Sequence, residues 1–312
     1  MSVDESYNRE SATLVESPDD LLSTASPLTF REFRICDVKL HAVQVEDLLE
    51  FVQQWMEGDR VFHYVSSTNV NNVEIALESP EYYEVMERAD LSLPDGVPFL
   101  WYGRLKGFPL RRRCGIEEFM EAVFEMSNRG FAYSHFFYGN TPEVLDNLKT
   151  RLLERYPNLT IAGMYSPPFR PLSPEEDEEH VRMINDSGAD FVWISLGCPK
   201  QEKWLYDHRN RLTAVIGGGA GAVFNFFSGE TFKAPDWVRY MGLEWILRLL
   251  VEPRRLFHRY CIKYPIFVLR FLKHSMGFRR VGHPMSSPSP LLSVLFLINA
   301  AGNMVDWLSD WF

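Results

Sequence analysis

The stretch from Ala189 to Tyr260 decides the fold of this chain, and its first two pieces read ADFVWISLGCPKQEKWL (Ala189–Leu205) and AVIGGGAGAVFNFFSGE (Ala214–Glu230). Their apolar runs, 191–196 and 214–216, are short and rich in β-branched and aromatic residues, and each closes on a glycine. That pattern predicts a buried strand followed by a helix, twice in succession. Ligands of parallel α/β sheets bind where strand carboxyl ends meet helix amino ends, because backbone N–H groups there point at anions.

The third piece, APDWVRYMGLEWILRLLVEPRRLFHRY (Ala234–Tyr260), carries four arginines behind those loops: Arg248, Arg254, Arg255 and Arg259. A ligand that bears phosphates needs its negative charge neutralised, and arginine does this through paired hydrogen bonds to phosphate oxygens. The alternative device is a divalent ion held by a DxD motif, which this sequence lacks. A basic helix face on anionic lipid is the plainer interpretation. The arginines can serve both phosphate and lipid if Arg248 and Arg255, which are seven residues apart, share a helix face.

Strand and helix signals alternate along most of the chain. This rhythm predicts an α/β fold, a Rossmann-like parallel sheet flanked by helices. We expect a C-terminal helical appendage near a membrane to follow this sheet. Residues 30–232 form the expected core. The predicted strands are 30–40, 60–66, 91–93, 133–138, 160–164, 191–196 and 214–216, and the predicted helices are 43–57, 71–88 with a break at Pro80, 117–129, 143–156 and 175–187.

The two ends of the chain differ from this core. Residues 1–29 are polar, acidic and Ser-rich, which predicts a disordered extension. Residues 233–280 hold eleven Lys or Arg and three acidic residues, a local charge of +8, which predicts a basic helical appendage. The tail, 281–312, is apolar and Trp-rich but too interrupted to span a bilayer. It fits a membrane interface or a partner subunit of a homo-oligomer.

Composition narrows the function classes. A net charge of −10 over 312 residues argues against a nucleic-acid partner, whereas the basic 233–280 segment points to phosphate or a membrane surface. The four cysteines are far apart and show no CxxC spacing, so we expect neither disulfides nor a zinc site. We also expect no signal peptide and no transmembrane helix, hence a cytoplasmic protein at the inner face of the membrane.

Polar side chains follow several predicted strands. Asp95 stands between a strand and a glycine, where it caps a turn or takes a proton from an acceptor hydroxyl. Ser67, Thr68 and Asn69 follow another strand, and helix capping is their plainer role.

Three further loops are candidates for nucleotide contact: Gly139-Asn140, Gly197 with Gln201, and the run from Gly217. The Gln201 amide either caps a helix or reads the uracil edge or the ribose, since it offers donors and an acceptor. Its neighbours Lys200 and Glu202 are expected to be exposed helix-start residues.

The glycine run, with Gly217 and Gly219, resembles a GxGxxA dinucleotide loop, in which the backbone approaches a phosphate. No acidic residue closes a following strand about twenty residues on, as NAD binding requires. That absence argues against NAD binding, so an NAD-dependent enzyme is an alternative hypothesis that the glycine loop alone supports.

These motifs are similar to those of the WecG/TagA/CpsF family of glycosyltransferases. The resemblance extends roughly from Val38 to Lys273, in the family's order. It rests on LGCPKQEKW, GAGAVFNFFSGE, APDWV, GLEWILRLLVEPRRLFHRY, ADLSLPDGVPFLW (Ala89–Trp101) and RRCGIEEFM (Arg112–Met120). It implies a glycosyltransferase that moves a sugar, with inversion, from a UDP-sugar to a polyprenyl-diphosphate-linked acceptor in envelope or extracellular polysaccharide synthesis.

The resemblance also implies residue roles. Asp95 corresponds to the catalytic base, and counting back twenty-six residues from it gives Asn69 as a nucleotide contact. The hydroxyl two residues before that Asn is usually Thr in the family; here it is Ser67, with Thr68 next to it. Gln201 corresponds to a nucleotide contact.

Two further implied contacts lie in motifs of their own. Arg112 or Arg113 contacts phosphate, and Asn225 stands where the family usually has Asp. In the family the C-terminal segment is an appendage that helps complete the active site. The departures at Ser67 and Asn225 favour a second alternative, a nucleotide-binding membrane scaffold that has lost catalysis.

Overall fold

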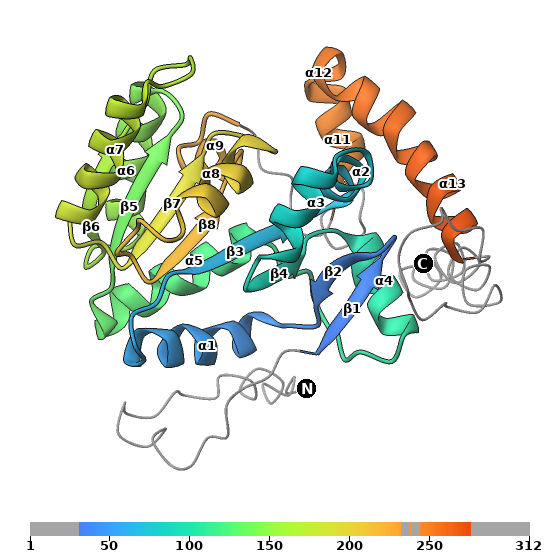
Figure 1. Ribbon diagram of the computed structural model, residues 1–312, viewed down its shortest axis with the longest axis horizontal. Coiled ribbons are helices and arrows are strands. Elements are labelled where there is room, and N and C mark those ends of the chain that lie inside the picture. Colours follow the sequence, from blue (N-terminus) through green and yellow to red (C-terminus); the bar gives the residue numbers. More distant parts are fainter. Residues whose placement is uncertain (1–30, 232–237, 239–243, 276–312) are drawn as a thin grey trace, which may run out of the picture.

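The structure is a computed structural model that describes residues 31–231, 238 and 244–275 (Figure 1). Its centre is a six-stranded sheet in the order β4-β3-β8-β7-β5-β6, and every neighbouring pair is parallel. The predicted Rossmann-like parallel sheet is therefore confirmed. The strands are β3 (His63–Thr68), β4 (Leu91–Pro94), β5 (Ser134–Gly139), β6 (Thr160–Tyr165), β7 (Phe191–Ser195) and β8 (Ile216–Gly219).

Helices cover both faces of this sheet because alternate strand residues are apolar on both sides. One buried cluster joins the sheet to α1 (Val45–Glu57), α5 (Ile116–Met126), α6 (Pro142–Arg155) and α9 (Val223–Phe227). The other joins it to α2 (Val70–Glu78), α3 (Pro80–Glu87), α7 (Pro174–Asp186) and α8 (Lys200–His208). Pro80 begins α3, as the predicted break required.

The strands predicted at 30–40 and 214–216 differ from those observed. In place of one strand, the structure has a hairpin, β1 (Glu32–Ile35) and β2 (Val38–His41), because Cys36 and Asp37 both adopt positive φ and turn the chain. The strand predicted at 214–216 is β8, which begins only at Ile216 and contains the glycine run. A Cβ on Gly217 would lie 2.3 Å from Phe62, so Gly217 provides close packing within a central strand.

The C-terminal helices stand beside α2 and α4 (Val97–Leu105) (Figure 1). They are α11 (Glu244–Val251), α12 (Pro253–Phe257), the π-helical turn η3 (His258–Lys263) and α13 (Tyr264–Ser275). Arg270 pairs with Glu74 at 2.7 Å, and the Phe271 ring meets Tyr102 edge-on at 5.2 Å. Within the described ranges, the appendage is therefore docked on the core through charged and aromatic contacts.

Candidate active site

Asp95 directly follows β4, at the carboxyl edge of the sheet. Its backbone N–H donates to Thr68 O at 2.9 Å, and its Oδ2 accepts a hydrogen bond of 3.1 Å from the Ser67 hydroxyl. Burial raises the pKa of Asp95. Arg113 opposes that rise, whereas Glu118 and Glu244 add to it. The carboxyl group thus holds a proton more tightly than an exposed aspartate does, which suits a general base.

Of the adjacent Arg112 and Arg113, Arg113 contacts this aspartate. The Arg113 guanidinium lies 3.8 Å from Asp95, and three glutamates also pair with it. Burial would lower the pKa of Arg113, but these carboxylates raise it above its usual value. The Arg112 side chain is exposed. The expected phosphate contact at Arg112 or Arg113 stays a prediction.

The structure separates the two candidate hydroxyls. Both lie in β3, which extends further than predicted, so their side chains point to opposite faces of the sheet. Ser67 faces Asp95, while the Thr68 hydroxyl pairs with Ser92 at 3.2 Å in the buried interior. Asn69 caps α2, since its side chain accepts from the Asn71 backbone N–H at 2.9 Å.

A second group of polar side chains lies at the carboxyl ends of β5, β7 and β8. The Asn140 amide donates to Asn225 Oδ1 at 2.5 Å and to the Ser195 hydroxyl at 3.4 Å. Ser195 in turn donates to Gly221 O at 2.8 Å. Gly139, the last residue of β5, is adjacent to this group. The structure therefore brings the predicted Asn140 and Asn225 into direct contact.

Gln201 lies in the first turn of α8, four residues after the loop glycine Gly197, and its side chain is 5% exposed. Gly219, the last residue of β8, leaves the space that the amide occupies: a Cβ there would lie 2.8 Å from Gln201 Nε2. Lys200 is exposed, as expected, but the expectation for Glu202 is wrong. Glu202 is buried, and burial raises its pKa, because α8 packs this turn against β3 and β8.

Of the four predicted arginines of the appendage, the structure describes the side chains of Arg248 and Arg254. Arg248 pairs with Glu244 at 2.8 Å and stacks over Phe226 at 4.7 Å, one residue from Asn225. Arg254 is exposed. The side chains of Arg255 and Arg259 fall outside the described part of the chain. Because α11 ends at Val251 and α12 begins at Pro253, seven-residue spacing alone does not place Arg248 and Arg255 on one face.

Within 31–231, 238 and 244–275, no helix is long and apolar enough to cross a bilayer. Across the same ranges, no group of three or more His, Cys, Asp or Glu side chains is arranged to hold a metal ion. The expected disorder of 1–29 and the apolar tail 281–312 lie outside these ranges.

A parallel sheet with carboxylate, hydroxyl and amide groups at its carboxyl edge defines the class of α/β proteins that bind their ligand there. Residues 33–281 match the model of the Glycosyl transferase WecG/TagA/CpsF family, so the chain belongs to that family.

Three relatives are each named N-acetylglucosaminyldiphosphoundecaprenol N-acetyl-beta-D-mannosaminyltransferase. The protein of Bacillus subtilis (strain 168) is 26% identical over 74% of this chain and 88% of its own length. That of Bacillus spizizenii is 30% identical over 64% of this chain and 74% of its own length. That of Staphylococcus aureus (strain NCTC 8325 / PS 47) is 28% identical over 70% of this chain and 87% of its own length.

Three functional candidates were missed from the sequence: Arg113 as the Asp95 partner, Glu244 as its link to the appendage, and Glu202. Acidic residues four and five positions after Arg113 were an available signal for pairing within one turn. No local signal indicated Glu244, which lies 131 residues away.

Proposed function

We propose that this chain is an inverting, metal-independent glycosyltransferase that moves a sugar from a UDP-sugar to a polyprenyl-diphosphate-linked acceptor. Family membership and the relatives' names support the reaction class and the lipid-linked acceptor. The observation that carries the proposal is Asp95, a partly buried carboxylate at the carboxyl edge, held by a hydroxyl and facing a guanidinium.

In the proposed reaction, the Asp95 carboxylate removes the proton from an acceptor hydroxyl as that oxygen attacks the anomeric carbon of the sugar. The bond from that carbon to the diphosphate oxygen breaks on the opposite face, so the configuration inverts and UDP leaves. Ser67 orients the carboxylate, and Arg113 limits the rise of its pKa. The leaving diphosphate is neutralised by arginines of the appendage, of which the side chains of Arg248 and Arg254 are described, because a guanidinium group makes paired hydrogen bonds to phosphate oxygens.

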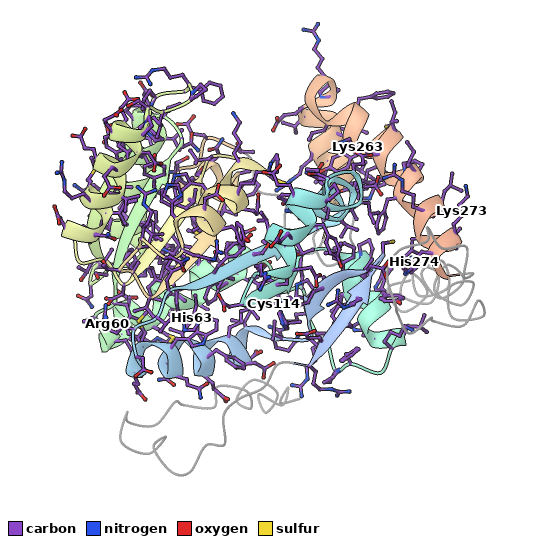
Figure 2. All side chains as sticks on the ribbon, in the orientation of Figure 1. Arg60, His63, Cys114, Lys263, Lys273 and His274 are labelled. Carbon is purple, nitrogen blue, oxygen red and sulfur yellow. The ribbon has the colours of Figure 1, made fainter. Side chains whose placement is uncertain are left out.

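The appendage also presents a surface suited to a membrane. Its inward residues Leu256, Tyr260, Phe267 and Phe271 are buried against the molecule. Its outward residues combine apolar and basic side chains, and Lys263 and Lys273 lie on the same helices (Figure 2). The exposed apolar residues are Trp245, Ile246, Leu250, Val251, Phe257, Ile262, Ile266, Val268 and Leu269. Such a surface inserts shallowly into an anionic bilayer, so we propose a peripheral protein at the inner face of the cytoplasmic membrane.

The decisive experiment is UDP release over a panel of UDP-sugars with a short lipid-diphosphate sugar acceptor, with and without EDTA. We expect turnover with one donor, persisting in EDTA. Asp95→Asn should lower turnover about 10²- to 10⁴-fold, because an amide cannot accept the proton, while UDP affinity stays within a few-fold. Asp146→Asn, on the exposed face of α6, is the matched control.

The other outcomes identify the alternatives. UDP binding without turnover on any donor would indicate the scaffold. Tight NAD binding without UDP binding would indicate a dehydrogenase. Full activity of Asp95→Asn would remove the base assignment.

A further inference from the structure

Gln201 and Glu202 form a buried polar pair in the first turn of α8, where helix residues are usually solvated. Their side chains are only 5% and 2% exposed. Gln201 Nε2 donates to Glu202 Oε1 at 2.9 Å. Burying two such groups is unfavourable unless their hydrogen bonds are satisfied, so the pair requires an explanation beyond helix capping.

The contact determines which way the amide points. A carboxylate can only accept, so the amide nitrogen must face Glu202 and the carbonyl oxygen must face away. That oxygen, Gln201 Oε1, accepts no hydrogen bond from the described residues. Leaving a buried acceptor unmatched is unfavourable, so its presence at the carboxyl edge points to a hydrogen-bond donor from outside the chain.

The loop that ends β8 adjoins this oxygen. A Cβ on Gly221, whose φ is +51°, would lie 3.1 Å from Gln201 Oε1. The same Gly221 carbonyl accepts from Ser195, which the Asn140 amide contacts. Gln201 Oε1 thus lies beside Gly221, which the Ser195 hydroxyl links to Asn140 at the carboxyl edge, and this is where we expect the nucleotide.

We propose that Glu202 is a positioning residue that locks the Gln201 amide so that its carbonyl oxygen accepts an N–H or O–H from the nucleoside of the sugar donor. The inference rests on the proposed function. Without Glu202, no carboxylate holds the amide nitrogen in place, so the NH₂ group can turn toward the ligand, where it opposes a donor. Tyr82 and Cys198 lower the pKa of this carboxyl group, against the rise that burial causes.

A double-mutant cycle in the full-length chain tests this, with UDP affinity by calorimetry and donor KM and kcat as readouts. Glu202→Met removes the acceptor at similar volume and should weaken UDP binding about 3- to 10-fold, through KM and not kcat. Gln201→Ala should cause a similar loss. The double variant should lose no more than Gln201→Ala, because Glu202 acts only through that amide. Glu202→Gln keeps an acceptor oxygen and should recover most of the affinity.

Additive losses in the double variant would overturn the proposal, as would a Glu202→Gln variant no better than Glu202→Met. A fall in kcat and melting temperature together, without a change in KM, would assign Glu202 to folding alone. If Glu202→Met does not fold, Glu202→Asp replaces it in the cycle, because the shorter side chain withdraws the carboxylate from the Gln201 amide by one methylene. Wild-type protein that does not bind UDP would refute the proposed function instead, so the two failures are distinguishable.

Discussion

Removing the Arg113 guanidinium should both destabilise the protein and alter the pH dependence of turnover. Arg113 lies within 4 Å of four carboxylates, Asp95 at 3.8 Å, Glu117 at 3.5 Å, Glu118 at 2.7 Å and Glu244 at 3.2 Å, and its side chain is 22% exposed. Arg113→Met keeps much of the side-chain volume but leaves those four negative groups without their shared cation.

The magnitude lies between two limits. Breaking an exposed ion pair costs about 0–1 kcal/mol, and removing one partner of a fully buried pair costs about 3–5 kcal/mol. For a side chain that is mostly but not fully buried, we expect about 2–4 kcal/mol. At roughly 2–4 °C per kcal/mol for a protein of this size, the melting temperature should fall by about 5–15 °C.

The same substitution should act on the base. Arg113 lowers the pKa of Asp95, so its loss raises that pKa further. The acid limb of the kcat/KM profile should therefore move to higher pH, because less of the base is ionised at any given pH.

The assays are thermal denaturation and pH–rate profiles of purified variants, with Arg112→Met as the matched control. Arg112 is adjacent, equally charged and exposed, and should change stability by no more than about 0.5 kcal/mol. If Arg113→Met melts with Arg112→Met and shows an unshifted profile, the carboxylate cluster around Arg113 does not exist in solution.

Three further predictions concern separate parts of the molecule. Ser67→Ala should lower turnover about 10-fold, since hydrogen bonds to charged groups contribute about 1.5 kcal/mol or more, whereas Thr68→Val should leave turnover near normal and reduce stability. Equal effects on turnover would contradict the facing assigned to the two hydroxyls. His135 is buried, and burial lowers its pKa to about 3, so the unfolded chain binds the extra proton between pH 6.5 and 3 and stability is lost as pH falls through that window. Between pH 7.5 and 4.5 the wild type should lose about 2–3 kcal/mol more than His135→Gln, measured by urea unfolding, and equal losses would rule out a neutral buried imidazole. Replacing Leu250 and Leu269, 72% and 60% exposed, with Ser should reduce sedimentation with anionic vesicles without lowering UDP affinity, and unchanged sedimentation would locate membrane contact elsewhere.

Much of the fold could be predicted from local pattern. Alternation of short apolar runs with amphipathic segments indicated a parallel sheet covered on both faces, because strand and helix periodicities are written into consecutive residues. The boundaries of the strands were harder to predict from the sequence. The glycines after Ile216 suggested a loop, yet they continue β8, because Phe62 and Leu205 pack where side chains would otherwise stand.

The sequence by itself determined the family, the position of Asp95 after a strand, and the polar residues at the strand ends. It could not choose between neighbours. Ser67 and Thr68, like Arg112 and Arg113, are adjacent and chemically alike. Only the pairing of β3 with β4 and the docking of α11 decide which of each pair faces Asp95. The burial of Glu202 was likewise hidden, because desolvation depends on what a helix packs against, and that is a property of the assembled structure and not of any local stretch of chain.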